Sequence, residues 1–251
     1  MDFSILRFDS IDSTNLEALR QASSGAAEGL VVIADEQTSG RGRAGRKWVS
    51  HKGFGLYISI VLRPQLSPRF LSLITLMSAL AVYDTLVEEF GLSADIKWPN
   101  DVIVREKKIS GILAETTETG TGLAVVVGIG LNLRSANFPA ELSESATSLE
   151  SELQLNDLSR AEPSLLGFFD YWYQVLGREN GPKKIIEAWR DRSTYFSGKR
   201  VIARLENESI TGTTDGLESN GALRIRKDDG NVVLVHSGDV MQFREHILNS
   251  N

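Results

Sequence analysis

A glycine- and arginine-rich segment carries the clearest chemical signal in this sequence. It reads Gln37, Thr38, Ser39, Gly40, Arg41, Gly42, Arg43, Ala44, Gly45, Arg46, Lys47 and Trp48. Glycines let the backbone N–H groups approach a ligand closely, and successive turn amides can form an anion-binding concavity. Guanidinium groups match carboxylate and phosphate oxygens, and an indole offers a flat face for stacking. The segment therefore suits a ligand that carries both negative charge and a ring.

The spacing of Gly40, Gly42 and Gly45 does not fit the dinucleotide-binding fingerprint, whose last glycine lies further on at the start of a helix. A Rossmann domain is therefore not expected. Taken alone, the segment is equally compatible with a solvated basic loop or with an arginine–glycine stretch that touches nucleic acid.

Composition narrows the function classes. The chain has 251 residues and a formal net charge of -6, which argues against a general binder of nucleic acid or anionic membranes and requires any anion site to be local. The absence of cysteine excludes disulfides, thiolate catalysis and cysteine-based zinc sites, and the three histidines lack metal-ligand spacing. The N-terminus lacks signal-peptide features and the longest apolar runs, such as residues 123–127, are too short to span a bilayer, so we expect a soluble cytoplasmic protein.

Strands and a short helix must position the basic segment. The apolar run 30–34 predicts a buried strand that leads into it, and residues 55–62 predict the strand that follows, so the segment lies at a sheet end. Thr14 and Glu17 have capping-box spacing, which predicts a helix whose N-terminus presents Ser13, Thr14 and Asn15. A longer helix is expected from Ser67 to Gly91.

The remainder of the pattern indicates an α+β fold with a mixed or antiparallel sheet flanked by helices. Further strands are expected at 96–98, 102–104, 109–114 and 123–127, a polar irregular excursion at 134–160, and helices at 165–176 and 183–189. The aromatic residues of these helices are expected in the core: Phe168, Phe169, Trp172 and Trp189. From Lys199 onward, short strands at 201–203, 209–211, 222–225 and 232–235 are separated by Asn220-Gly221 and Asp229-Gly230, which predicts a small β-barrel.

With these elements in place, the chain resembles the biotin protein ligases. The resemblance rests on five blocks in order, which are residues 12–15 (DSTN), 37–48 (QTSGRGRAGRKW), 97–101 (KWPND), 108–115 (KISGILAE) and 127–133 (VGIGLNL). It implies a catalytic domain of the class II aminoacyl-tRNA synthetase/biotin ligase-like fold over residues 1–197, and a C-terminal SH3-like β-barrel over residues 198–251. A subgroup of this family carries an N-terminal winged helix that binds operator DNA. This sequence begins almost at the catalytic block, so DNA binding is not expected.

The resemblance implies an ATP-dependent ligase. Such an enzyme activates biotin as biotinyl-5'-AMP with the help of Mg2+, and then transfers the biotinyl group to one lysine of a biotin carboxyl carrier protein. It also leaves monomer and homodimer open, with a weak preference for the dimer, and it names no general base for the transfer step.

Site residues are carried over position by position. Matching catalytic residues are Lys108, Arg43 and Lys97, with Lys108 on the biotin carboxylate. Matching biotin-binding residues are Ser13, Thr14, Asn15, Gln37, Gly40, Arg41, Gly42, Arg43, Lys108, Gly111 and Gly128. Matching ATP-binding residues are Arg43, Arg46, Lys47, Trp48, Lys97, Asn100 and Asn132, and Asp101 matches the metal ligand. Without the resemblance, Lys108 would be read as a solvated hairpin lysine and Asp101 as a turn former.

Two other functions remain open from the sequence. One is a lipoate protein ligase, whose fold and adenylate chemistry are related, although the Gly-Arg-Gly-Arg motif favours biotin. The other is a non-catalytic module that binds a nucleotide or nucleic acid through the basic loop. The spacing of Lys108, Asp101 and Asn132 argues against that second alternative.

Overall fold

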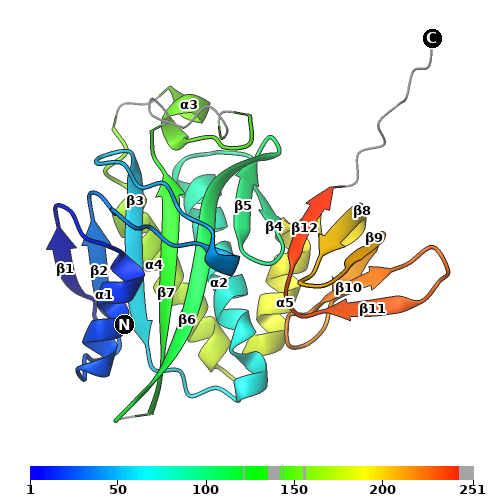
Figure 1. Cartoon of the computed structure of the whole chain (residues 1–251), viewed down its shortest axis with the longest axis horizontal. Coiled ribbons are helices and arrows are strands. Elements are labelled where there is room, and N and C mark those ends of the chain that lie inside the picture. Colours follow the sequence, from blue (N-terminus) through cyan, green and yellow to red (C-terminus); the bar gives the residue numbers. More distant parts are fainter. Residues whose placement is uncertain (121, 135–141, 143, 155–156, 243–251) are drawn as a thin grey trace.

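The computed structural model of this protein describes residues 1–120, 122–134, 142, 144–154 and 157–242. Its strands form two separate sheets (Figure 1). The larger has seven strands in the order β1-β2-β3-β7-β6-β5-β4; β1 is parallel to β2, and the other neighbours are antiparallel. Its strands are β1 (Ser4–Phe8), β2 (Leu30–Ala34), β3 (Gly55–Leu62), β4 (Asp95–Lys97), β5 (Asp101–Val104), β6 (Lys107–Thr119) and β7 (Gly122–Asn132). The predicted mixed sheet is confirmed.

Helices cover both faces of this sheet (Figure 1). One face carries α1 (Thr14–Ser23), and the other carries α2 (Ser72–Asp84), α4 (Ala161–Gly177) and α5 (Gly181–Arg192). A 3-10 turn at Pro68–Phe70 precedes α2 and a π-helical turn at Thr85–Glu89 extends it, while α3 (Leu149–Leu153) is short. The central strands are thus buried on both sides, which explains their unbroken apolar runs.

The alternation of side chains along the strands divides the core into two parts. Val31 and Ile33 belong to the large cluster beneath α2, α4 and α5, whereas Val32 between them packs with Val61 and Val126 in a small cluster beneath α1. This period of two is the geometry of a pleated strand. Successive positions of one strand therefore face either the large core or the α1 side.

Several elements differ from the sequence-based expectation. Strand β1 was not predicted, because it is a short edge strand whose residues are mostly exposed and show no apolar run. Strands β6 and β7 extend well beyond the apolar positions that predicted them. The segment 134–160, expected to be irregular, contains α3. Residues 135–141, 143 and 155–156 of it lie outside the described residues.

The helical stretch Pro68–Glu89 corrects the expectation that every apolar stretch is too short to span a bilayer. By length and composition it could cross a membrane, with a mean hydropathy of 1.8 over its most apolar window. Of that window, 67% is buried inside the protein, between the larger sheet and helices α4 and α5. A helix that is apolar nearly all round is what a position in the centre of a core requires.

The second sheet is antiparallel and has the order β11-β10-β9-β8-β12. Its strands are β8 (Ser197–Arg204), β9 (Ser209–Leu217), β10 (Leu223–Arg226), β11 (Val232–Val235) and β12 (Asp239–Gln242), the last of which was not predicted. The predicted turn at Asn220-Gly221 reaches the larger domain, where Trp98 Nε1 donates to the Gly221 carbonyl at 2.9 Å. Ser72 Oγ donates to the Asn220 carbonyl at 2.6 Å. Hydrogen bonds therefore link this turn to the larger domain.

Leu80→Ala tests the assignment of α2 to the core. Leu80 is 0% exposed in the large cluster, and its truncation should lower the free energy of unfolding by about 2–5 kcal/mol. The control is Leu234→Ala, because Leu234 on β11 is 46% exposed and the change should stay within about 0.5 kcal/mol. Urea unfolding followed by circular dichroism measures both, and equal midpoints for the two variants would contradict the assignment.

Candidate active site

Helix α1 covers only part of its face of the larger sheet. On β7, Ala124 and Val126 pack in the cluster beneath α1. The next positions with the same orientation are Gly128, Gly130 and Asn132. Beyond the N-terminus of α1, the strand thus presents almost no side chains on this face.

Neighbouring strands continue this bare surface. In register across the sheet, two rows of the same face read Asp101–Gly111–Gly130–Tyr57 and Leu113–Gly128–Ser59. We call Gly111, Gly128 and Gly130 the glycine floor. Because cross-strand partners lie side by side on one face, the polar side chains of Asp101, Tyr57 and Ser59 frame this floor.

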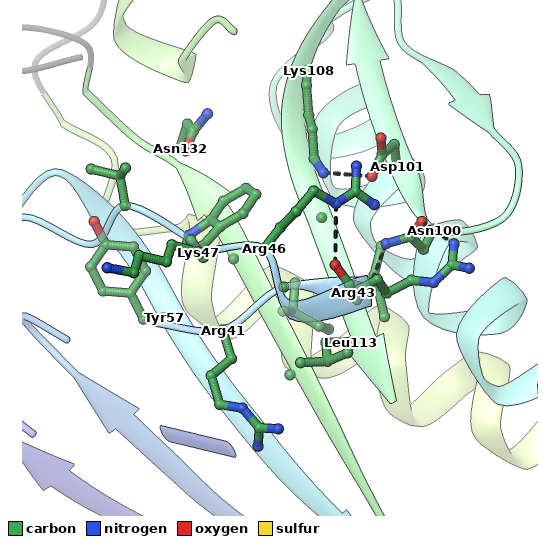
Figure 2. Close-up of a pocket in the computed structure, with 18 of the residues that line it drawn as sticks. Arg41, Arg43, Arg46, Lys47, Tyr57, Asn100, Asp101, Lys108, Leu113 and Asn132 are labelled. Atoms are coloured by element: carbon green, nitrogen blue, oxygen red, sulfur yellow. Dashed lines mark hydrogen bonds and ion pairs between the residues drawn. The ribbon is translucent and has the colours of Figure 1, made fainter. Parts of the chain in front are cut away.

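A cavity of about 370 Å³ lies over the glycine floor. It is bounded by the loop 41–48 and by the N-terminal residues of α1, and Figure 2 shows its cationic and polar side chains. The structure brings nearly all of the predicted site residues together there: Ser13, Thr14, Asn15, Gln37, Arg41, Gly42, Arg43, Arg46, Lys47, Trp48, Lys97, Asn100, Asp101, Lys108, Gly111, Gly128 and Asn132.

Gly40 differs from the other predicted biotin-binding residues, since it packs inside the base of the loop. A Cβ on Gly40 would lie 2.3 Å from the Trp48 carbonyl oxygen and 2.7 Å from Ser50 Oγ. Its carbonyl accepts a hydrogen bond from the Trp48 N–H at 2.9 Å. Gly40 therefore allows the two ends of the loop to approach each other.

Trp48 lies on the glycine floor. A Cβ on Gly130 would lie 2.4 Å from its Cε2 atom, and a Cβ on Gly111 would lie 3.0 Å from Cζ3. Lys108 Nζ is 5.2 Å from the centroid of the indole ring, a cation–π distance. The buried Trp48 Nε1 has no hydrogen-bond partner within the described part of the chain. Two glycines thus make room for a ring against the sheet, beside a lysine ammonium.

Lys108 and Asp101 form an ion pair at the edge of the floor. Lys108 Nζ lies 2.6 Å from Asp101 Oδ1 (Figure 2), and the two side chains are 34% and 23% exposed. The Lys108 backbone is fixed by N–H donation to the Ser145 carbonyl at 2.8 Å. Asn132 Nδ2 donates to the Thr147 carbonyl at 3.0 Å, which orients its amide.

Two arginines of the loop contact the C-terminal sheet. Arg43 Nη1 donates to Asn100 Oδ1 at 3.0 Å and to the Gly238 carbonyl at 3.4 Å. Arg46 Nη2 forms an ion pair with Asp239 Oδ1 at 2.8 Å. Burial lowers the pKa of Arg43, although a guanidinium stays protonated at any ordinary pH. Arg43 and Arg46 therefore connect the loop to the C-terminal domain.

The N-terminus of α1 forms a polar end of the cavity, and it corrects the predicted capping box. Thr14 is the first helical residue and Ser13 is the N-cap, which makes no side-chain capping bond. The Thr14 N–H and hydroxyl both donate to Gln37 Oε1, at 2.8 and 3.0 Å. Glu17 instead accepts hydrogen bonds from Arg20 and Gln21. Thr14 therefore bonds to Gln37 at the cavity and does not cap the helix.

Buried hydroxyl groups fix the amide side chains at this polar end. Ser59 Oγ lies 2.6 Å from Asn15 Oδ1 and 2.8 Å from Thr14 Oγ1, and it is fully buried. Gln37 Nε2 donates to Ser50 Oγ at 2.8 Å. Each amide oxygen has two lone pairs and each hydroxyl can both donate and accept, so this end can accommodate a neutral polar group.

Sequence reasoning assigned no role to several residues of this region: Ser50, Tyr57, Ser59, Gly130, Gly238 and Asp239. Ser59 could have been singled out from the sequence, because it carries the only hydroxyl besides Tyr57 in the apolar strand 55–62. Burial raises the pKa of Tyr57, which keeps its phenol protonated as a donor to the His51 carbonyl. Nothing in the sequence singled out Asp239, since only the fold brings it to Arg46 of the loop.

The cavity combines a polar end, a flat glycine floor and a cluster of cations. Such an arrangement can hold a carboxylate and a phosphate close together, because fixed cations offset their mutual repulsion. In the described part of the chain no three His, Cys, Asp or Glu side chains gather as a metal site. The single carboxylate of Asp101 fits a Mg2+ ion only when nucleotide phosphates supply further ligands.

Comparison with known proteins identifies the family to which this chain belongs. Residues 7–132 match the model of the biotin/lipoate A/B protein ligase family, and residues 196–241 match the biotin protein ligase C terminal domain. The chain is 36% identical over 230 residues to the biotin–acetyl-CoA-carboxylase ligase of Paracoccus denitrificans, covering 89% of this chain and 94% of that protein. It is 33% identical over 242 residues to the bifunctional ligase/repressor BirA of Bacillus subtilis, covering 94% of this chain and 73% of that protein.

A solved structure shares the whole architecture. The biotin protein ligase from Aquifex aeolicus in complex with biotin and ATP superposes with a TM-score of 0.83 at 30% identity, covering 96% of this chain and 99% of that one. The fold is thus that of an α+β ligase domain of the class II aminoacyl-tRNA synthetase/biotin ligase type followed by a small antiparallel, SH3-like domain, as expected. The chain belongs to the biotin/lipoate A/B protein ligase family.

Gly128→Ala tests whether the glycine floor is required for the packing of α1. A Cβ there would lie 2.0 Å from Asn15 Oδ1, which buried bonds hold in place, so the variant should lose about 1–3 kcal/mol of stability. Gly167→Ala on α4 is the control, because no atom lies within 4 Å of its added Cβ. Thermal unfolding of both variants measures the difference, and an unchanged midpoint for Gly128→Ala would refute the close approach.

Proposed function

We propose that this protein is a biotin protein ligase, which joins biotin to ATP as biotinyl-5'-AMP and transfers the biotinyl group to a lysine of a biotin carboxyl carrier protein. The observation that carries the proposal is the Lys108–Asp101 pair at 2.6 Å beside the glycine floor, in one cavity with the loop arginines and the polar end of α1. The family membership and the relatives named above support the same activity.

In the first step, a carboxylate oxygen of biotin attacks the α-phosphorus of ATP, a new P–O bond forms, and the bond to the β-phosphate breaks to release pyrophosphate. Both reactants are anionic, so the barrier depends on positioned positive charge. We assign Lys108 to the biotin carboxylate and the α-phosphate. Arg43, Arg46, Lys47 and Lys97 are assigned to the phosphates, with Asn100 and Asn132 as neutral donors and Trp48 as the ring contact.

Asp101 is assigned to Mg2+ bound with ATP. The ion would neutralise phosphate charge, and Asp101 would hold it with one carboxylate while the nucleotide supplies other oxygens. The present pairing of Lys108 with Asp101 keeps both charges balanced before substrates bind. With substrates bound, Lys108 would contact the biotin carboxylate, and Asp101 would be free to hold the ion.

In the second step, the deprotonated amine of the acceptor lysine attacks the carbonyl carbon of the mixed anhydride, and AMP leaves. The cavity supports this step by holding the adenylate in place, because alignment of the two reactants supplies much of the rate. No side chain is assigned as the base that removes the proton.

The polar end favours biotin over lipoate. A ureido ring has N–H donors and a carbonyl acceptor, which suit the hydroxyl and amide groups of Ser13, Thr14, Asn15 and Gln37. The dithiolane ring of lipoate has no such groups, so it would forgo the hydrogen bonds available to a ureido ring, which contribute about 0.5–1.5 kcal/mol each. We therefore assign these residues, with Arg41, Gly42, Gly111 and Gly128, to biotin.

The remaining parts of the proposal concern organisation. We divide the chain into a catalytic domain, residues 1–197, and a C-terminal domain, residues 198–251, since β8 begins at Ser197 and starts the second sheet. The protein is proposed to be cytoplasmic and to act on the carrier protein of a biotin-dependent carboxylase and not on DNA, with a homodimer as the preferred of two open oligomeric states.

Lys108→Ala tests the catalytic assignment. Loss of this ammonium should reduce biotin-dependent pyrophosphate release about 100-fold or more, the scale of one transition-state electrostatic contact. Lys107→Ala is the matched control, because it removes the same charge from the adjacent residue of β6, which points to the other face of the strand. Near-equal rates for the two variants would remove Lys108 from the mechanism.

Arg43→Gly tests the role of the loop. The variant should slow formation of biotinyl-5'-AMP or release it into solution, since it removes a cation and two contacts of the loop, to Asn100 and Gly238. Chromatography of the free adenylate after ATP, Mg2+ and biotin are added measures this release, with circular dichroism as the check on folding. Retention equal to that of the unaltered protein would refute the assignment.

Substrate choice is tested with the unaltered protein, ATP, Mg2+ and either biotin or lipoate. Pyrophosphate release that depends on biotin, together with a mass gain on an added carrier domain, is the expected result. Release with lipoate alone would instead identify a lipoate ligase, and nucleic-acid binding without any release would identify a non-catalytic module.

A further inference from the structure

Glu115 holds the base of the basic loop. Its carboxylate accepts one hydrogen bond from Arg41, with Nη1 at 3.1 Å from Oε2, and in the same ion pair Arg41 Nη2 lies 3.0 Å from Oε1. A charge-assisted hydrogen bond within an ion pair is stronger than a neutral one, so this contact attracts and orients both groups. The side chains are 40% and 21% exposed, so water weakens the pair but does not surround the carboxylate.

The same carboxylate holds the N-terminus of α1. Asn15 Nδ2 donates to Glu115 Oε2 at 2.9 Å and to the Leu113 carbonyl at 3.3 Å. Asn15 Oδ1 lies 2.6 Å from Ser59 Oγ, so three of the four hydrogen-bonding positions of this amide are used within the protein. Asn15 is therefore held in one orientation by β3 and β6.

Glu115 thus joins two parts of the site that are far apart in sequence. Arg41 lies at the start of the turn that Gly42 N–H closes by donating to the Arg46 carbonyl at 2.8 Å, and Arg41 pairs with Lys47 in an isolated bridge. Asn15 belongs to the polar end of the cavity. Glu115 itself is not among the described residues that line the cavity, so it acts through its two partners.

We propose that Glu115 is a positioning residue that couples the basic loop to the polar end of the cavity. Glu115 keeps the start of the loop against β6 and holds the Asn15 amide at the polar end of the cavity. The loop therefore stays closed over biotin and its adenylate. This inference rests on the proposed function. It predicts that loss of the carboxylate loosens the loop without removing any group that touches the substrates.

Glu115→Gln is the sharpest substitution. Glutamine keeps the size of the side chain and one oxygen that can accept from Asn15 and from Arg41 Nη1, but it carries no negative charge and its NH₂ group would face Arg41 Nη2, so the ion pair is lost. The Michaelis constant for biotin and the rate of escape of biotinyl-5'-AMP should each rise about fivefold, while kcat changes less than twofold, as expected for a partly exposed pair. Glu118→Gln is the matched control, because it makes the same change at an exposed position of β6.

Two further measurements separate a coupling role from a merely structural one. In the Arg41→Gln background, Glu115→Gln should add little to the escape rate, because the ion pair is already broken; fully additive effects would overturn the proposal. Trypsin cleavage within residues 41–47 should be faster in Glu115→Gln than in Glu118→Gln, with and without biotin, and equal cleavage rates would also overturn it.

The trypsin experiment keeps this inference distinct from the proposed function. Without substrates, it reports only whether Glu115 restrains the loop. If the unaltered protein forms no biotinyl-5'-AMP, the proposed function fails, and faster loop cleavage in Glu115→Gln would still support the restraint while its catalytic consequence is rejected. If the adenylate forms and Glu115→Gln matches Glu118→Gln in every measurement, the inference alone fails.

Discussion

The absence of side chains at Gly111, Gly128 and Gly130 is the constraint on which the site depends. On the same face of the same strands, Ala124 and Val126 are covered by α1, and the cover ends where the glycines begin. Any larger residue at Gly130 would meet the indole of Trp48, and any at Gly128 would meet Asn15. On β7, this face of the sheet thus changes from core to cavity surface within two residues, from Val126 to Gly128.

Positive charge gathers around this cavity although the chain as a whole is acidic. The chain carries a formal net charge of -6, yet the cavity gathers Arg41, Arg43, Arg46, Lys47, Lys97 and Lys108. Several of these cations have carboxylate partners outside the cavity or at its rim, such as Glu115, Asp239 and Asp101. The partners limit mutual repulsion while the site is formed, and they hold the cations where substrate oxygens would replace or join them.

Sequence patterns predicted the parts of the protein that depend on local physics. The apolar runs at 30–34 and 55–62 became β2 and β3, since strands buried on both faces need such runs. The basic loop between them was found at the predicted sheet end. The capping box was wrong, because Thr14 has a tertiary partner in Gln37 that local spacing does not reveal. Strand β1 and the roles of Ser59 and Asp239 likewise depend on contacts between distant segments.

The contact of the basic loop with the C-terminal sheet has a mechanical consequence. Arg43 reaches the carbonyl of Gly238 and Arg46 reaches the carboxylate of Asp239, both at the start of β12. Any rotation of the small domain about the Trp98–Gly221 junction must either drag the tip of the loop with it or break these two links. A partner protein that rotates the small domain on binding would therefore move the basic loop without entering the cavity.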